Sequence, residues 1–257
     1  MRILVVSQTS WSSDNNGGNT LDNLFREVNA EFAHIYFSEG QPNTDICNLF
    51  YQVTDKMIID HIVKRTKIGK IVHKDESKIN NEIKIENSLK KYKNIYTIIA
   101  RELLWKISDV LNKEMDEFIT EFNPDVIYAP IYGNFRMLRI AALIKNKYKK
   151  PMISFISDDL YSYKKQSSKV ENIYQYFLRK KLYDFFKLPD IIYTMTEEQK
   201  VEYQDIFNRE LRLLKKSYYN LLPMNNIHKP IRYIYAGGTY LGRDNILNKL
   251  IDIFEQK

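Results

Sequence analysis

Short apolar runs alternate with amphipathic segments along most of the chain. The runs are rich in Val, Ile, Phe and Tyr and predict strands at 3–6, 34–37, 49–53, 125–129, 152–156, 190–194 and 211–214. Apolar residues spaced three and four apart predict helices between them, at 20–28, 57–63, 135–144, 170–186 and from 196 onwards. Strands that alternate with helices indicate an α/β protein, a Rossmann-like parallel sheet with helices on both faces.

Two stretches in the first half depart from this alternation. From 64 to 93 charges dominate, which indicates a surface excursion that is helical in part or mobile in part. The stretch 95–122 then predicts one long amphipathic helix. Its apolar stripe, which we expect to pack in the core, is Ile99, Leu103, Ile107, Val110, Leu111, Met115, Phe118 and Phe122.

The last part of the chain has a different organisation. Residues 220–230 hold Pro223 and Pro230 and indicate a linker after a first domain, 1–219. A strand (231–236), a glycine-bearing loop and a helix (245–254) follow. Because one such unit does not bury both faces of its strand, we expect residues 231–257 to be the start of an incomplete second Rossmann-like domain.

The loop after the first strand carries candidate chemistry. Gly17 and Gly18 stand where the loop turns into a helix. A backbone without side chains can approach a ligand there, and a helix N-terminus attracts anions. The alternative is that the two glycines only shape the turn, since a full dinucleotide-binding fingerprint is missing.

Polar residues also follow two later strands. Asp158 and Asp159 come directly after the strand 152–156, and Gly133 follows the strand 125–129. Ligands of open α/β sheets bind at the carboxyl ends of parallel strands, so the two aspartates are candidate catalytic residues and Gly133 is a candidate donor- or acceptor-binding residue. The alternative for the two aspartates is helix capping.

The net charge of the 257-residue chain is +7, and the excess is local. Residues 56–113 hold 14 Lys and Arg against 7 Asp and Glu, and the rest of the chain is balanced. Such a region suits an anionic membrane surface, a phosphate-bearing substrate or nucleic acid, or is simply a solvated face. Aromatic residues follow core-like patterns, so we do not expect a nucleic-acid partner.

Several other classes of protein are not indicated. The one cysteine, Cys47, allows no disulfide within the chain, and the N-terminus does not resemble a signal peptide. No apolar run is long enough to cross a bilayer. We therefore expect a cytoplasmic protein whose membrane contact, if any, is peripheral at the inner face. The four histidines lack metal-ligand spacing, and neither a hydrolase elbow nor a P-loop occurs.

Four segments together resemble a known family. They are RILVVS with the Gly17–Gly18 loop, PMISFISDDLY (151–161), PDIIYTMTEEQKVEY (189–203) and IRYIYAGGTYLGRDNILNKLI (231–251). In this order they are similar to the GT-B glycosyltransferases of the family 4, or group 1, type. The resemblance implies two Rossmann-like domains that face a cleft, the first binding the acceptor and the second a nucleotide-sugar. It implies no cofactor and no metal.

The resemblance also implies roles for individual residues. Gly17 and Gly18 match the family's first glycine-rich loop, and Gly237 and Gly238 match the first loop of the donor domain. Arg243 resembles the basic residue that contacts the donor diphosphate.

Two features depart from the family pattern. Many members have a His-Asp pair where this chain has Ser157-Asp158-Asp159, so the role of the histidine is vacant or altered. The paired glutamates of the family's donor site are missing, and we interpret the matching spacing of Glu202 and Glu210, which fall in the first domain, as chance.

Two hypotheses follow. In the first, the chain is the acceptor-side domain of a glycosyltransferase that moves a sugar from a nucleotide-sugar to a glycan or lipid-linked acceptor, in surface polysaccharide synthesis. It is then truncated and inactive alone, or one half of a split enzyme whose second chain supplies the rest of the donor domain. In the second, the chain is a non-enzymatic module that holds an anionic or lipid-linked partner at the membrane through residues 56–113.

Overall fold

The computed structural model describes residues 1–13, 16–73, 94–162, 168–215 and 243–255. The chain divides into two compact units, Met1–Ser217 and Tyr218–Lys257. The expected linker, the strand at 231–236 and the residues Gly237 and Gly238 lie outside the described residues.

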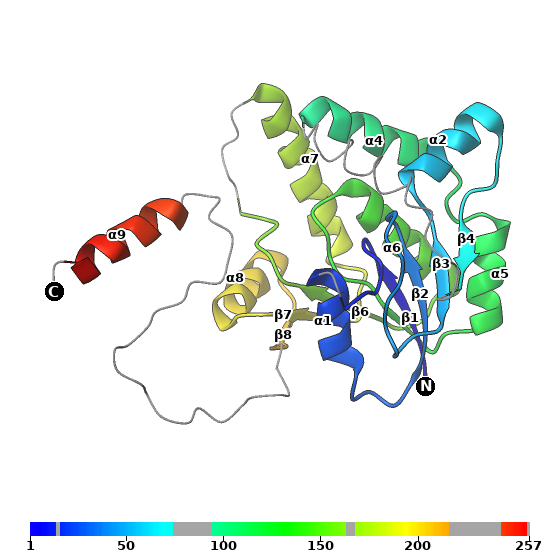
Figure 1. The fold of residues 1–257 in the computed structure, drawn as a ribbon, viewed down its shortest axis with the longest axis horizontal. Helices are drawn as coiled ribbons and strands as arrows, with labels where there is room; N and C mark the ends of the chain where they lie inside the picture. Colours follow the sequence, from blue (N-terminus) through cyan, green and yellow to red (C-terminus); the bar gives the residue numbers. More distant parts are fainter. Residues whose placement is uncertain (14–15, 74–93, 163–167, 216–242, 256–257) are drawn as a thin grey trace. The chain divides into compact units, whose positions relative to one another are not determined.

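The first unit is built on one eight-stranded sheet (Figure 1). In spatial order the strands are β4-β3-β2-β1-β5-β6-β7-β8. All neighbouring strands are parallel except β4, which pairs antiparallel with β3. The strands are β1 (Arg2–Ser7), β2 (Glu31–Tyr36), β3 (Leu49–Gln52), β4 (Lys70–Val72), β5 (Val126–Tyr128), β6 (Met152–Ile156), β7 (Ile191–Thr194) and β8 (Arg212–Leu213). The α/β class expected from the sequence is confirmed.

Helices cover the two faces of this sheet unequally. The described helices of the first unit are α1 (Asn16–Phe25), α2 (Asp55–Lys64), α4 (Ile95–Ile107), α5 (Lys113–Phe122), α6 (Phe135–Tyr148), α7 (Lys169–Phe185) and α8 (Glu197–Phe207). Six of them, all but α1, bury residues with Leu4, Val6 and Ile35 on one face. On the other face α1 and two loops pack over Val5, Tyr36 and Phe50.

The prediction of one long helix over 95–122 is wrong, because helix α4 ends at Ile107. Ser108 is extended (ψ 140°), and Asn112 accepts a hydrogen bond from Met115 N as the N-cap of α5. A new helix therefore begins after five residues. Leu103 and Ile107 of the first of these helices are exposed instead of lying in the expected core stripe.

Other local predictions can be compared directly. Thr196 caps α8, where the sequence predicted a helix from 196 onwards, and accepts a hydrogen bond from Gln199 N. The first helix begins at Asn16 and not at Thr20, so Gly17 and Gly18 belong to its first turn. The edge strand β4 was not predicted, because Lys70–Val72 lies in a stretch dominated by charge.

The second unit contains one described helix, α9 (Arg243–Glu255). It covers the predicted helix 245–254. Its apolar side chains Ile246, Leu250, Ile251, Ile253 and Phe254 are exposed.

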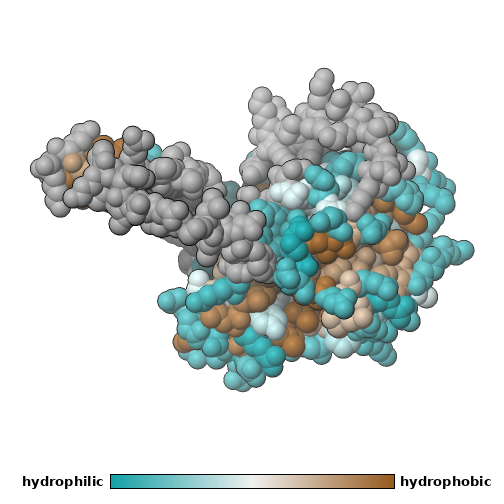
Figure 2. Space-filling model, turned by 60° about the horizontal axis from the view of Figure 1, so that its bottom comes forward, coloured by the Kyte–Doolittle hydropathy of each residue, from teal (hydrophilic) through white to brown (hydrophobic). Residues whose placement is uncertain are grey.

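No helix among the described residues is long and apolar enough to cross a membrane. On the side of the molecule shown in Figure 2, apolar side chains reach the surface in small areas separated by polar ones.

Candidate ligand site at the carboxyl edge of the sheet

The order of the strands defines where a ligand is expected. From β1 the chain proceeds to β2 and β3 on one side and then crosses to β5, β6 and β7 on the other. The order therefore reverses between β1 and β5, which pair directly. In open α/β sheets the crevice for ligands lies at this point, outside the carboxyl ends of the strands.

A side-chain hydrogen bond between two amides helps to join the two loops at this point. Asn134 Nδ2 donates to Gln8 Oε1 at 2.8 Å, so the loop after β5 is tied to the loop after β1. The oxygen of the Asn134 side chain accepts from Met137 N at 3.0 Å and caps α6. Asn134 thus fixes an N-terminus with its positive partial charge beside the first loop.

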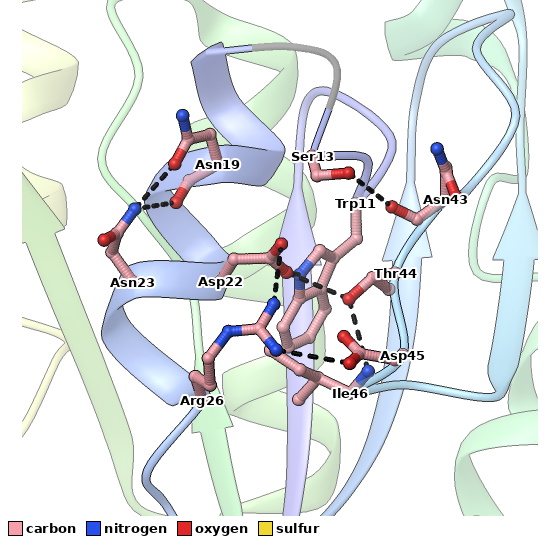
Figure 3. A network of polar contacts seen from close by, with 10 residues as sticks. All are labelled: Trp11, Ser13, Asn19, Asp22, Asn23, Arg26, Asn43, Thr44, Asp45 and Ile46. Carbon is pink, nitrogen blue, oxygen red and sulfur yellow. Dashed lines mark hydrogen bonds and ion pairs between the residues drawn. The ribbon is translucent and has the colours of Figure 1, made fainter. Parts of the chain in front are cut away.

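The first loop is pinned by a polar network (Figure 3). The indole of Trp11 is fully buried, and its Nε1 donates to Asp22 Oδ1 on α1 at 2.6 Å. Thr44 Oγ1 donates to the same oxygen at 2.9 Å, and Arg26 forms ion pairs with Asp22 and Asp45. The network holds the loop after β1, helix α1 and the loop 43–46 together.

The two glycines of this loop have different surroundings. A Cβ on Gly18 would lie 2.1 Å from Ser12 O and 2.2 Å from Ser12 N, a distance that no side chain tolerates. Gly18 is therefore required for close packing of α1 against the loop. Gly17 is exposed in the same turn. Of the two predicted residues, Gly17 is the one that a ligand can approach.

The two aspartates after β6 also differ. Asp159 Oδ1 accepts hydrogen bonds from Tyr203 Oη (3.0 Å), Ser162 N (3.0 Å) and Tyr161 N (3.3 Å). Desolvation raises the pKa of Asp159, but the hydrogen bonds from Ser162 and Tyr203 outweigh it, so the net shift is downward. Asp159 thus binds backbone N–H groups of the loop after β6. This is a structural role, as the capping alternative also implied.

Asp158 is exposed. Its carboxylate accepts a hydrogen bond from Ser157 Oγ at 3.3 Å, while its backbone oxygen accepts from Gln199 Nε2 at 3.0 Å. The backbone is held while the carboxylate faces solvent at the carboxyl edge. Both aspartates are exposed, but Asp159 accepts hydrogen bonds from Tyr203 and two backbone N–H groups, so Asp158 is the carboxylate that is more open to a ligand.

Gly133 brings the loops after β5 and β6 together. It is exposed, and a Cβ on it would lie 3.2 Å from Leu160 Cδ2 in the loop that carries the aspartates. The predicted residues Gly133, Asp158 and Asp159 thus lie on adjacent loops. Gln8 was not predicted; its only signal is its position directly after a strand.

A buried ionic cluster lies behind the first turn of α6. The Arg136 side chain is 3% exposed, sits over the Trp105 ring at 5.2 Å and is 3.5 Å from Asp55 Oδ1. Glu102 Oε2 accepts a hydrogen bond from Arg136 N at 2.7 Å. Burial lowers the pKa of Arg136 to about 10 and raises that of Glu102. The cluster fixes α2, α4 and α6 to one another.

The side chain of His34 is fully buried below the first loop. One ring nitrogen, Nε2, is 2.8 Å from Ser7 Oγ, and Nδ1 has no hydrogen-bond partner among the described residues. Burial lowers the pKa of His34 to about 3, so the ring is neutral. A neutral, enclosed imidazole supports the loop and is not exposed to a substrate.

The remaining predicted residues are on the second unit. Arg243 begins α9, and its side chain is outside the described part, as are Gly237 and Gly238. Within the described ranges no group of three His, Cys, Asp or Glu side chains could hold a metal ion.

The comparisons with known proteins include a distant match among solved structures. No protein-family model matches the chain, and no curated protein matches its sequence. Among solved structures, the chain is similar to a UDP-glucosyltransferase from Polygonum tinctorium capable of glucosylating indoxyl, in complex with 3,4-dichloroaniline. The identity is 7% and the TM-score 0.38, over 89% of this chain and 55% of that protein. The chain thus spans about half the length of this structural relative.

Proposed function

We propose that the first unit is the acceptor-side domain of a glycosyltransferase, which moves a sugar from a nucleotide-sugar to a glycan or lipid-linked acceptor. The observation that carries the proposal is the Asn134–Gln8 hydrogen bond at the point where the strand order reverses, with Asp158 exposed on the same edge. Amides and a carboxylate are the groups that bind sugar hydroxyls, since each hydroxyl both donates and accepts.

In this proposal each residue has a defined role. Asp158 accepts a hydrogen bond from an acceptor hydroxyl and orients it. Gln8 and Asn134 form the floor of the site, and Gly17 lets the N-terminus of α1 approach the substrate. The chemistry then depends on orientation and on stabilising the diphosphate that leaves.

The second unit has a role in the same proposal. Gly237, Gly238 and Arg243 would belong to the nucleotide-sugar side. The guanidinium of Arg243, with its fork of donors, would contact the diphosphate.

A ligand screen tests the class of substrate. The full chain is screened by saturation-transfer NMR against a panel of saccharides, amino acids and short oligonucleotides. We expect saccharides alone to bind. Binding of amino acids or oligonucleotides with no saccharide binding would contradict the proposal.

A further inference from the structure

Helix α4 is apolar on two sides. Its core side buries Ile95 and Trp105. On the opposite side of the helix, at spacings of four, three and four residues, lie Tyr96, Ala100, Leu103 and Ile107, all exposed. Tyr96 is 67% exposed and Ile107 71%. Because a row of exposed apolar side chains on a helix marks an interaction surface, the outer side of α4 points to a binding partner.

A second exposed helix, α2, neighbours α4. The two helices pack against each other (Figure 1), and Arg101 of α4 forms an ion pair with Asp55 of α2. Helix α2 also exposes large apolar residues. The α2–α4 surface, as we define it, consists of Ile59, Ile62, Val63, Tyr96, Leu103 and Ile107.

The charges around these helices indicate what kind of partner fits. The described residues between 56 and 113 include eight Lys and Arg but three Asp and Glu. Lys56, Lys64 and Lys106 are exposed on the two helices themselves. Long basic side chains beside exposed Leu, Ile and Tyr suit an anionic bilayer, because the apolar groups enter the headgroup region while the amines reach lipid phosphates.

We infer that the α2–α4 surface docks onto an anionic phospholipid membrane. The inference is independent of the proposed function, since it concerns exposed side chains of two helices and not the carboxyl-edge site. It places a membrane contact on named side chains, where the sequence alone indicated only a basic region.

Vesicle co-sedimentation of the full chain tests the inference. The vesicles are phosphatidylcholine with and without phosphatidylglycerol. We expect binding to the anionic vesicles only, weakened by salt. Lys106→Glu should weaken it by about fivefold or more, the effect of one basic residue near such a surface.

The apolar half is tested with a variant that keeps helix propensity. Leu103→Gln with Ile107→Gln should abolish binding that persists in high salt, because glutamine is a good helix former but does not enter the bilayer. Val201→Gln on α8, where Val201 is 54% exposed, is the matched control and should bind like the wild type. Circular dichroism confirms that each variant is folded.

Three results would overturn the inference. One is no binding to anionic vesicles, and a second is equal binding by the α4 variant and the control. The third is a dimer in light scattering that the α4 variant dissolves in the absence of lipid, which would identify a second copy of the chain as the partner.

Discussion

The side-chain amide of Asn134 donates to Gln8 Oε1 at 2.8 Å while its oxygen caps α6. One residue thus performs two tasks that substitution can separate. Asn134→Ser keeps a capping oxygen and loses the bridge, whereas Asn134→Ala loses both. We expect Asn134→Ala to lower the free energy of unfolding by about 1–2 kcal/mol more than Asn134→Ser, measured by urea denaturation.

The bridge itself is measured by a double-mutant cycle. Asn134→Ser and Gln8→Met are combined, and we expect a coupling free energy of about 1 kcal/mol. Additive effects of the two substitutions would show that the loops are not joined by this hydrogen bond.

The two glycines of the first loop should respond oppositely to alanine. Gly18→Ala places a Cβ against the Ser12 backbone and should destabilise the protein by about 1–3 kcal/mol. Gly17→Ala, exposed in the same turn, should be neutral or slightly stabilising because alanine favours a helix. Thermal unfolding of both variants compares them, and equal destabilisation would contradict the packing described for Gly18.

Burial of His34 makes stability depend on pH. Its pKa is about 3 in the folded protein against 6.5 unfolded, so the unfolded chain binds more protons in acid. This contribution is complete above pH 6.5 and is lost as the pH falls towards 3. As the pH falls from 7 to 5, protonation of His34 in the unfolded chain should lower the free energy of unfolding by about 2 kcal/mol, measured by urea denaturation.

Two variants isolate this effect. His34→Gln should remove this loss of stability between pH 7 and 5. The control His73→Gln, at an exposed position, should show the same loss as the wild type. A decline of the wild-type size in His34→Gln would contradict a neutral, buried imidazole.

Tyr203 and Asp159 hold the backbone of the loop after β6 in place. The Tyr203 hydroxyl donates to Asp159 and accepts from Leu160 N and Tyr161 N. Tyr203→Phe leaves these groups without that partner and should cost about 1–3 kcal/mol of stability. Tyr193→Phe, at a partly exposed position on β7, is the control and should change stability little. Similar losses in both variants would argue against a specific role for the Tyr203 hydroxyl.

The parallel sheet was predictable because its strands are short, apolar and separated by amphipathic helices. Met152–Ile156 was predicted to the residue, because Pro151 and Ser157 stand on either side of a run that is apolar except for Ser154. The break at Ser108 was not predictable from periodicity, because Val110 and Met115 continue an apolar pattern across it. Asn112 caps a new helix here, and the apolar periodicity on either side of it does not mark where one helix ends and the next begins.

The candidate site was predictable only in outline. That Asp158 and Asp159 follow a strand is visible in the sequence, but their different environments depend on Tyr203, 44 residues further on. The Glu102–Arg136 contact likewise joins two helices 34 residues apart. Such pairings are set by the tertiary fold, so residue order alone assigned both aspartates the same role.

Asp158 is the carboxylate that we propose meets a sugar hydroxyl, and an affinity comparison tests this role. The saccharide that binds best in the NMR screen is titrated calorimetrically into the wild type, Asp158→Asn and the control Asp205→Asn, an exposed aspartate on α8. We predict at least a tenfold loss of affinity for Asp158→Asn, about the value of one hydrogen bond to a charged group, and none for Asp205→Asn. Equal affinities for all three proteins would contradict the placement of the sugar site at this edge of the sheet.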